Sequence, residues 1–228
     1  MPLFFRGKRM EIQPIAHVEN DYTSKFGVPR QSGLVEEVIS RIVFEPGYRI
    51  PEMLRGLEDF SHLWLIWGFH ELNREGWRPT VRPPRLGGNT RVGVLATRSP
   101  YRPNPLGLSS VRLTGIENGE LLVAGADLMN GTPIYDIKPY LPTADCHPEA
   151  SGGFTDTREK RRVRVEIPDT EREKLTERQA AALEGLLAED PRPAYQEDPE
   201  REYAFEFAGR TVRFRVAEGT LRVTSVGE

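Results

Sequence analysis

The side chains best suited to chemistry in this chain are arginines gathered in one block. Between Gly76 and Gly115 the sequence has seven arginines and neither Asp nor Glu. A guanidinium presents a planar fork of donors that matches phosphate and carboxylate groups. The block therefore predicts an anion site, which an RNA backbone, a nucleotide or an amino-acid carboxylate would each fit. The alternative is a solvated basic loop with water and small ions as partners. The seven are Arg78, Arg82, Arg85, Arg91, Arg98, Arg102 and Arg112.

The same block holds six prolines and six glycines, which indicates irregular backbone of defined shape. Further polar clusters occur at 25–31 (KFGVPRQ), 127–133 (DLMNGTP) and 135–142 (YDIKPYLP). Loops that carry function on a rigid β scaffold are a common arrangement, and turns that need Asn, Gly and Pro for geometry alone are the alternative. Asp136 and Lys138 face the same side of an extended segment, where they could simply pair with each other.

The sequence lacks the motifs of several kinds of functional site. The four histidines are scattered and Cys146 is the only cysteine, so the sequence predicts no metal site and no disulfide. There is no nucleophile elbow, no phosphate-binding P-loop and no Gly-rich dinucleotide fingerprint. Among the histidines, His70 is the best placed to meet a ligand, because it follows a predicted strand directly and Glu71 is next to it.

Composition limits the class of protein. The chain has 228 residues, a net charge of -3, 38% hydrophobic and 29% charged residues, as expected of a soluble globular protein. The negative charge is concentrated between Asp156 and Glu228, so it does not argue against a polyanionic partner near the arginines. The N-terminal residues lack the apolar run of a signal peptide, and LWLIWGF is too short to span a bilayer. We expect a cytoplasmic protein with no membrane partner.

The first part of the chain is mainly β. Strands are predicted at 10–20, 40–44, 60–69, 92–97, 111–117 and 121–126, with a short helix at 51–58. The segment 60–69 (FSHLWLIWGF) is apolar on both faces and predicts a strand buried on both sides. Asn118-Gly119 predicts a hairpin turn between the last two strands. So many strands with so little helix favour a small β-barrel that is not a Rossmann fold.

A composition change at 144–160 indicates a linker, and a small α+β domain is predicted after it. Strands are expected at 161–167, 203–207, 211–216 and 221–226. One long helix is expected at 170–189, with Thr170 and Glu173 as a capping box. The domains are therefore predicted at 10–150 and 158–228.

Five segments together resemble the TrmO family of tRNA N6-methyltransferases: KFGVPRQSGLV, RGLEDFSHLWLIWGFH, GWRPTVRPPRLGGNTRVGVLATRSPYRPNPLGLS, DLMNGTPIYDIKPYLP and DPRPAY. The resemblance implies a β-barrel that binds S-adenosylmethionine, and methyl transfer to N6 of N6-threonylcarbamoyladenosine beside the anticodon of threonine tRNA. It also implies a homodimer with the cofactor near the subunit interface, and a C-terminal domain of the bacterial type.

The resemblance also implies site residues. The cofactor contacts it gives are Pro29, Arg30, Gln31, His70, Glu71, Arg98, Leu106, Leu108, Asp127 and Leu128. A group that accepts the N6 proton would assist the reaction, and the candidates are Asp127, Asp136 and Tyr140. Contacts with tRNA are expected from Arg78, Arg82, Arg85, Arg91, Arg102, Lys138, Arg192 and Tyr195.

Two other functions are compatible with the same residues. One is a non-catalytic protein that binds RNA or another anion on the same barrel. The other is a methyltransferase whose arginines grip an acidic small molecule. Binding of S-adenosylmethionine is expected of a methyltransferase and not of the non-catalytic protein. Turnover that depends on added tRNA is expected of a tRNA methyltransferase and not of one that acts on a small molecule.

Overall fold

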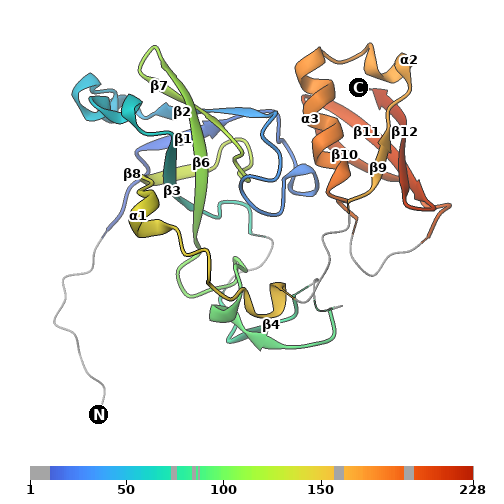
Figure 1. The fold of residues 1–228 in the computed structure, drawn as a ribbon, viewed down its shortest axis with the longest axis horizontal. Helices are drawn as coiled ribbons and strands as arrows, with labels where there is room; N and C mark the ends of the chain where they lie inside the picture. The colour runs from blue at the N-terminus through green and yellow to red at the C-terminus, as the bar shows by residue number, and fades with distance from the viewer. Residues whose placement is uncertain are drawn as a thin grey trace.

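The structure, a computed structural model, describes residues 11–72, 76–83, 86, 88–156, 162–192 and 198–227. These residues form a six-stranded barrel, a small two-stranded arm and a C-terminal sheet with a helix beside it (Figure 1). The predicted fold class, a small β-barrel followed by a small α+β part, is confirmed.

The barrel consists of β1 (Ala16–Glu19), β2 (Ile39–Phe44), β3 (His62–Gly68), β6 (Leu106–Glu117), β7 (Glu120–Ala124) and β8 (Pro133–Pro139). All neighbouring strands are antiparallel, and the sheet closes in the order β1-β2-β7-β6-β3-β8. Closure removes the unpaired edges that an open sheet would leave. The sequence does not predict β8, because a proline stands at each of its ends.

The aromatic strand β3 forms one wall of the barrel. Its side chains alternate as a strand requires, and Leu63 and Leu65 are fully buried inside. The prediction of burial on both sides was only partly right, because the outer face is half-covered. There the ring of Trp64 lies 5.5 Å from that of Tyr140, and its Nε1 donates to Asp145 at 2.8 Å, in the short helix α1 (Pro142–Asp145).

The turn between β6 and β7 is the predicted hairpin. Asn118 and Gly119 both have positive φ, 52° and 80°. Left-handed backbone at both positions is what a type I′ turn requires, and the Asn-Gly pair adopts it at low cost.

Two local predictions were wrong in the barrel half. In place of a helix at 51–58 there are two 3-10 turns, Pro51–Leu54 and Leu57–Asp59, interrupted by Gly56 with φ of 82°. In place of a strand at 92–97, only β5 (Val92–Gly93) pairs, with β4 (Thr80–Val81), and a 3-10 turn follows. The two strands form the arm at the bottom of Figure 1.

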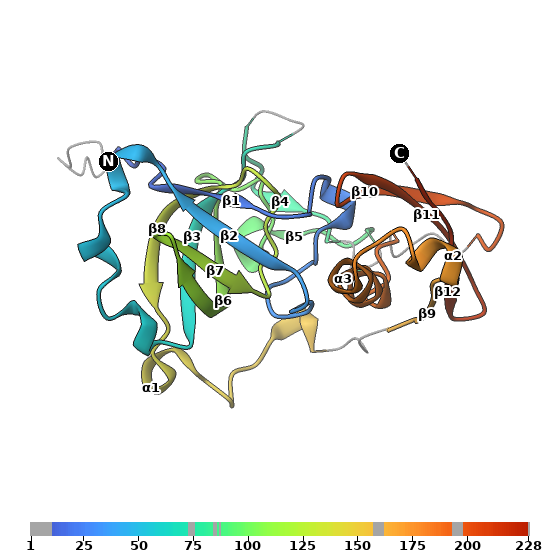
Figure 2. The same ribbon diagram turned by 90° about the horizontal axis from the view of Figure 1, so that it is seen from above.

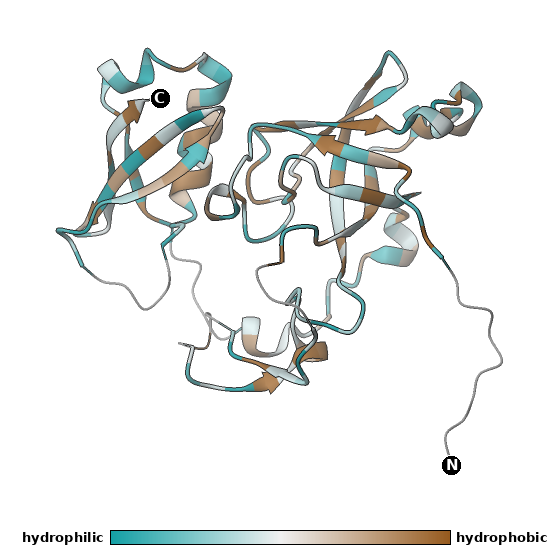
Figure 3. Ribbon diagram, turned by 180° about the vertical axis from the view of Figure 1, so that it is seen from behind, coloured by the Kyte–Doolittle hydropathy of each residue, from teal (hydrophilic) through white to brown (hydrophobic). Residues whose placement is uncertain are grey.

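The C-terminal part is a four-stranded sheet packed against a helix. Its elements are β9 (Arg164–Glu166), α2 (Asp169–Arg172), α3 (Glu177–Ala188), β10 (Tyr203–Phe207), β11 (Arg210–Ala217) and β12 (Thr220–Gly227). The strand order is β10-β11-β12-β9, and only β9 and β12 are parallel. Apolar and polar residues alternate along these strands, and α3 lies along one face of the sheet (Figures 2 and 3).

The predicted helix at 170–189 is divided in two. The capping box is at Thr176 and Gln179, whose side chains bond each other's backbone N–H at 3.2 and 3.1 Å. The prediction that Thr170 and Glu173 form the capping box was wrong. A second pattern of this kind, with Gln in place of Glu, occurs at Thr176–Gln179 and lies closer to the apolar stripe. Leu183, one of the leucines that reach the core, belongs to α3.

Candidate active site

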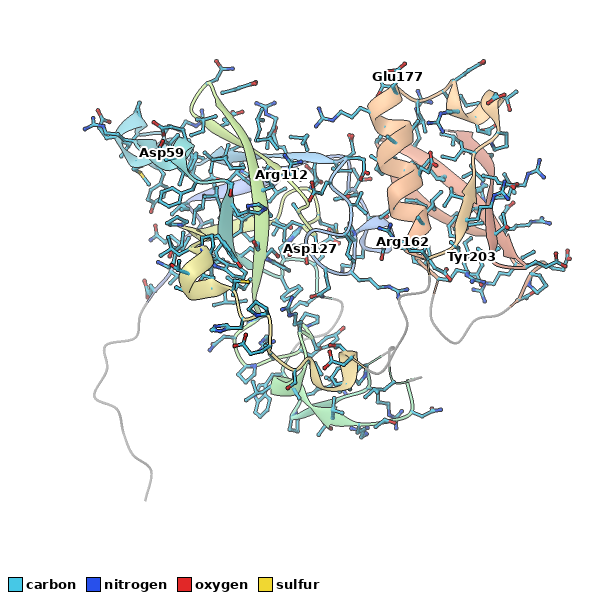
Figure 4. The ribbon with its side chains drawn as sticks, in the orientation of Figure 1. Asp59, Arg112, Asp127, Arg162, Glu177 and Tyr203 are labelled. Atoms are coloured by element: carbon cyan, nitrogen blue, oxygen red, sulfur yellow. The ribbon has the colours of Figure 1, made fainter. Side chains whose placement is uncertain are left out.

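The end of β3 and the loop after β7 enclose a cavity of about 270 Å3. Trp67, Phe69 and Leu128 give it apolar walls, and Glu71 and Asp127 give it carboxylates. Pro100 and Tyr101 also line it, so the arginine-rich segment contributes one wall. Asp127 lies on the side of the barrel toward the C-terminal part (Figure 4).

A buried chain of hydrogen bonds positions the Asp127 carboxylate. The indole Nε1 of Trp67 donates to Ser109 Oγ at 2.9 Å, and Ser109 Oγ donates to Asp127 Oδ1 at 2.5 Å. Because Ser109 already accepts from the indole, its single proton is directed at the carboxylate. This fixes one carboxylate oxygen at the cavity wall.

A glycine makes this arrangement possible. Gly107 lies opposite Trp67 in the β3–β6 ladder, and a Cβ at this position would overlap the Trp67 indole ring. Without a side chain at 107, the indole can lie flat across β6 and reach Ser109 two residues further along. The requirement here is for close approach and not for unusual backbone angles.

The environment of Asp127 raises the pKa of its carboxyl above the ordinary value. Burial is the main cause, because it disfavours the charged form. The hydrogen bond from Ser109, backbone N–H groups and the positive charge of Arg98 act in the opposite direction without cancelling it. The result is a carboxylate with a greater affinity for a proton than an exposed Asp has.

The loop of the PRQ match lies beside the cavity, where Lys25 and Val28 form part of the lining. Lys25 Nζ is 3.7 Å from Glu71 Oε2, and the Gln31 side chain accepts a hydrogen bond from Arg98. Pro29 is buried, and Arg30 is exposed. The structure therefore brings His70, Glu71, Asp127 and Leu128 to one cavity, and it joins Gln31 to Arg98, whereas Pro29 and Arg30 are not among the lining residues.

The predicted arginines have different surroundings. Arg112 finds a carboxylate outside the block, with Nη2 3.0 Å from Glu36 Oε2. Arg91 and Arg102 donate to Thr80 Oγ1 and to the Thr97 carbonyl at 3.0 and 3.1 Å. Arg78 and Arg82 are exposed on the arm, and Arg85 lies outside the described residues.

Other predicted residues lie away from the cavity. Asp136 forms an ion pair with Lys138 at 2.9 Å on β8, as the alternation of the sequence allows. Tyr140 lies near His62, at the opposite end of β3 from the cavity. Leu106 and Leu108 on β6 pair with Gly68 and Ile66 on β3, and neither leucine lines the cavity. Leu108 is 54% exposed.

Arg192 is held by Asp190, with Nε 2.8 Å from Oδ1, at the end of α3. Tyr195 lies outside the described residues.

Sequence reasoning missed the residues that hold Asp127 and several that line the cavity. Ser109 is the most informative, because strand alternation from the buried Val111 would have assigned Ser109, and not Leu108, to the inner face. Trp67, Phe69 and Leu72 also line the cavity and were not predicted. Other lining residues lie in the predicted clusters or in the arginine block but were not named individually as site residues: Lys25, Val28, Pro100, Tyr101, Met129 and Thr132.

In the part of the chain that the structure describes, no three His, Cys, Asp or Glu side chains are grouped so that they could hold a metal ion. None of the helices built from the described residues has the length and apolar character needed to cross a bilayer.

A closed barrel with an acid-bearing cavity and a cationic arm at its rim defines a class of binding protein separate from the Rossmann-type folds. Residues 17–146 match the sequence model of the tRNA-methyltransferase O N-terminal domain, and residues 160–228 match that of the TrmO C-terminal domain. The chain belongs to the TrmO family.

Two relatives and one solved structure show how close the similarity is. The chain is 41% identical over 225 residues to an Escherichia coli protein named tRNA (adenine(37)-N6)-methyltransferase, which covers 93% of this chain and 96% of the relative. It is also 41% identical over 200 residues to a Pseudomonas aeruginosa protein described as a candidate S-adenosylmethionine-dependent methyltransferase, with 84% and 86% covered. The crystal structure of TrmO from P. aeruginosa superposes with a TM-score of 0.81 at 33% identity, covering 98% of this chain and 100% of that one.

The contact at Gly107 predicts the effect of a substitution. Gly107→Ala forces a Cβ into the Trp67 indole, so we expect a loss of about 1–3 kcal/mol in the free energy of unfolding, measured by urea denaturation. Gly47→Ala is the control, because a Cβ there meets nothing within 4 Å. Equal stability of the two variants would contradict the role given to Gly107.

The raised pKa of Asp127 predicts a pH-dependent stability. Because the folded protein holds this proton more tightly than the unfolded chain, the native protein loses stability as pH rises from the ordinary Asp pKa of about 3.9 through the folded value. Asp127→Asn removes the charge and keeps an acceptor for Ser109. We expect the variant and the native protein to have similar melting temperatures near pH 4, and the variant to have the higher melting temperature at pH 8. Asp136→Asn, which removes an exposed carboxylate, is the control; the same rise in both would contradict the assignment.

Proposed function

We propose that this protein transfers a methyl group from S-adenosylmethionine to N6 of N6-threonylcarbamoyladenosine, at adenine 37 beside the anticodon of threonine tRNA. The observation that carries the proposal is the Asp127 carboxylate, which has a raised pKa and lines a cavity that has the arginine-rich segment as one wall. The names of the relatives support the methyl donor and the tRNA adenine.

The residues around the cavity fit the methyl donor. Aromatic and aliphatic side chains such as Trp67 and Leu128 suit a purine ring, and the carboxylates of Glu71 and Asp127 suit the donor's positive charges. Gln31 and Arg98, which are hydrogen-bonded to each other, would close one side. His70, Pro29 and Arg30 remain proposed contacts of the donor.

The chemistry divides between the donor and the protein. S-adenosylmethionine supplies a methyl group on a sulfonium, which is already electrophilic. The residues of the chain hold that methyl and N6 in line, and alignment of this kind supplies much of the rate in such reactions. In the threonylcarbamoyl form N6 is a urea-like nitrogen, a poor nucleophile but more acidic than an ordinary adenine amine. We propose that Asp127 accepts its proton, since a base with a raised pKa is better matched to neutral pH.

The threonine carboxylate of the modified base gives the arginines a specific partner. A forked contact from Arg78, Arg82, Arg85, Arg91 or Arg102 would recognise it, and unmodified adenosine would leave that guanidinium without its anion. The side chains of Trp77 and Leu95 on the same segment are 57% and 77% exposed. Exposed apolar surface among cations suits the unstacked bases of an anticodon loop.

Several parts of this proposal rest on the sequence. The homodimer and tRNA contacts by Lys138, Arg192 and Tyr195 come from the resemblance, whereas the cytoplasmic location and the boundaries 10–150 and 158–228 come from composition and the absence of targeting segments. Leu106 and Leu108 could reach the donor only from the outer side of β6, where a second subunit would have to complete the site.

Asp127→Asn tests the base. At saturating S-adenosylmethionine, so that a loss of cofactor affinity does not affect the rate, we expect single-turnover methylation to slow by about 10²- to 10⁴-fold, the usual contribution of a general base. Asp136→Asn and Tyr140→Phe are the comparison variants, and we expect each to keep the native rate. An unchanged rate in Asp127→Asn would leave alignment alone as the catalytic device, and a slow Asp136→Asn or Tyr140→Phe would assign the base there.

The substrate is tested with labelled S-adenosylmethionine and total tRNA, followed by digestion and identification of the methylated nucleoside. We expect label in methylated N6-threonylcarbamoyladenosine, and at least about 10²-fold slower reaction with tRNA that lacks the threonylcarbamoyl group. Replacing the recognising arginine by Ala should remove most of that discrimination. Comparable turnover of unmodified tRNA would contradict the carboxylate contact, and label transfer without tRNA would favour an acidic small molecule as substrate.

A further inference from the structure

The C-terminal part shares its hydrophobic core with a segment of the barrel half. Tyr22, Val35 and Val38 are 0%, 1% and 5% exposed, and they belong to the same buried cluster as Leu183 of α3 and Phe207 of β10. These apolar side chains of the segment from Tyr22 to Val38 are therefore buried against the C-terminal elements. The segment includes the PRQ residues, Pro29, Arg30 and Gln31.

The turn just before the PRQ residues rests on β10. The rings of Phe26 and Phe205 are 6.1 Å apart, and Ser24 Oγ donates to the Glu206 carbonyl at 3.3 Å. A Cβ on Gly27 would lie 2.5 Å from Phe205 Cδ2, closer than real Cβ contacts come. Gly27 is thus pressed against Phe205, and the ring limits how near the turn can approach β10.

A second set of bonds holds the PRQ residues themselves. Arg30 Nη2 donates to the carbonyls of Asp190 and Arg192 at 2.9 and 2.8 Å. These carbonyls follow the C-terminal end of α3, where backbone acceptors lack helical partners and the helix dipole favours a cation. The Asp190 carboxylate accepts from Arg192 Nε and Nη2, both at 2.8 Å, which fixes the two carbonyls relative to each other.

The opposite side of the same segment forms the cavity. Lys25 and Val28 line it, Lys25 pairs with Glu71, and Gln31 bonds Arg98. Phe26 and Gly27, which contact Phe205, stand directly between Lys25 and Val28 in the chain. A displacement at their contact with Phe205 is therefore transmitted directly to the cavity wall.

We propose that the C-terminal domain is a positioning element of the S-adenosylmethionine site, with Phe205 and the carbonyls after α3 setting the place of the PRQ loop. The inference rests on the proposed role of that loop in cofactor binding. Phe205 acts through the loop and is a positioning residue. The C-terminal domain has this role whether or not it touches tRNA.

Calorimetry with S-adenosylmethionine and no tRNA tests the proposal on the full-length chain. We expect Gly27→Ala to weaken binding by about tenfold and to raise KM for the cofactor more than it lowers kcat, because the new Cβ moves the turn away from Phe205. In the double variant Gly27→Ala/Phe205→Leu the smaller side chain makes room, and we expect most of the affinity to return.

Gly27→Ala/Phe207→Leu is the matched control. Phe207 is as deeply buried as Phe205 and contacts Tyr22, so the substitution loosens the same core without making room for the Cβ. Recovery of affinity only with Phe205→Leu supports positioning. Equal recovery in both, or native affinity in Gly27→Ala, overturns it.

Three further variants keep the test decisive. Gln31→Ala tests the premise: native affinity in that variant contradicts the role of the PRQ loop itself, whereas weak binding there with native binding in Gly27→Ala contradicts positioning alone. If Gly27→Ala does not fold, Phe205→Ala is compared with Phe207→Ala at temperatures well below both melting transitions. Weaker cofactor binding specific to Phe205→Ala supports the proposal, and equal affinities overturn it.

Discussion

The geometry of the site depends on one partly buried carboxylate at the end of a barrel. Asp127 follows β7, and its position is fixed by a hydroxyl on β6 that is itself oriented by the indole of Trp67 on β3. Residues from three parts of the chain thereby hold a single oxygen atom. Burial makes the charged carboxylate costly, and the hydrogen bond from Ser109 limits that cost without removing it.

The second organising feature is the segment between Tyr22 and Val38, which belongs structurally to both halves. Its apolar residues complete the C-terminal core, and its polar residues border the cavity. Because side chains in a close-packed core have little freedom to shift, such a segment is positioned more firmly than an ordinary surface loop. The division of the chain into two folding units and the assembly of the site are thus linked through the same few residues.

The arginine block between Gly76 and Gly115 shows that the charge of nearby residues in the sequence does not determine the partners of a side chain in the fold. No acid occurs within the block, yet Arg112 finds Glu36 from a distant loop. Arg78 and Arg82 are exposed on the arm, and Arg98 reaches back to Gln31. Among its described residues, the block therefore has one arginine with a structural carboxylate, one that joins loops at the cavity, two that donate hydrogen bonds within the block, and two that are exposed on the arm.

The sequence by itself determined the features that depend on neighbouring residues, such as strand alternation, a hairpin turn and local charge. Period-two alternation predicted β10 and the core of β3, Asn118-Gly119 predicted its turn, and the absence of acids marked the arginine block. Alternation also predicted correctly that Asp136 and Lys138 lie on the same side of their strand, but it did not show that neither residue lines the cavity. Tertiary structure decided the rest: that Asp127 is bonded to Ser109 beside a cavity while Asp136 is paired with Lys138, that Ser109 and not Leu108 faces inward, and that Thr176 begins the helix. The physical reason is that alternation fixes a period but not which face is enclosed, and that burial, and with it the pKa of a carboxyl, is produced by elements far away along the chain.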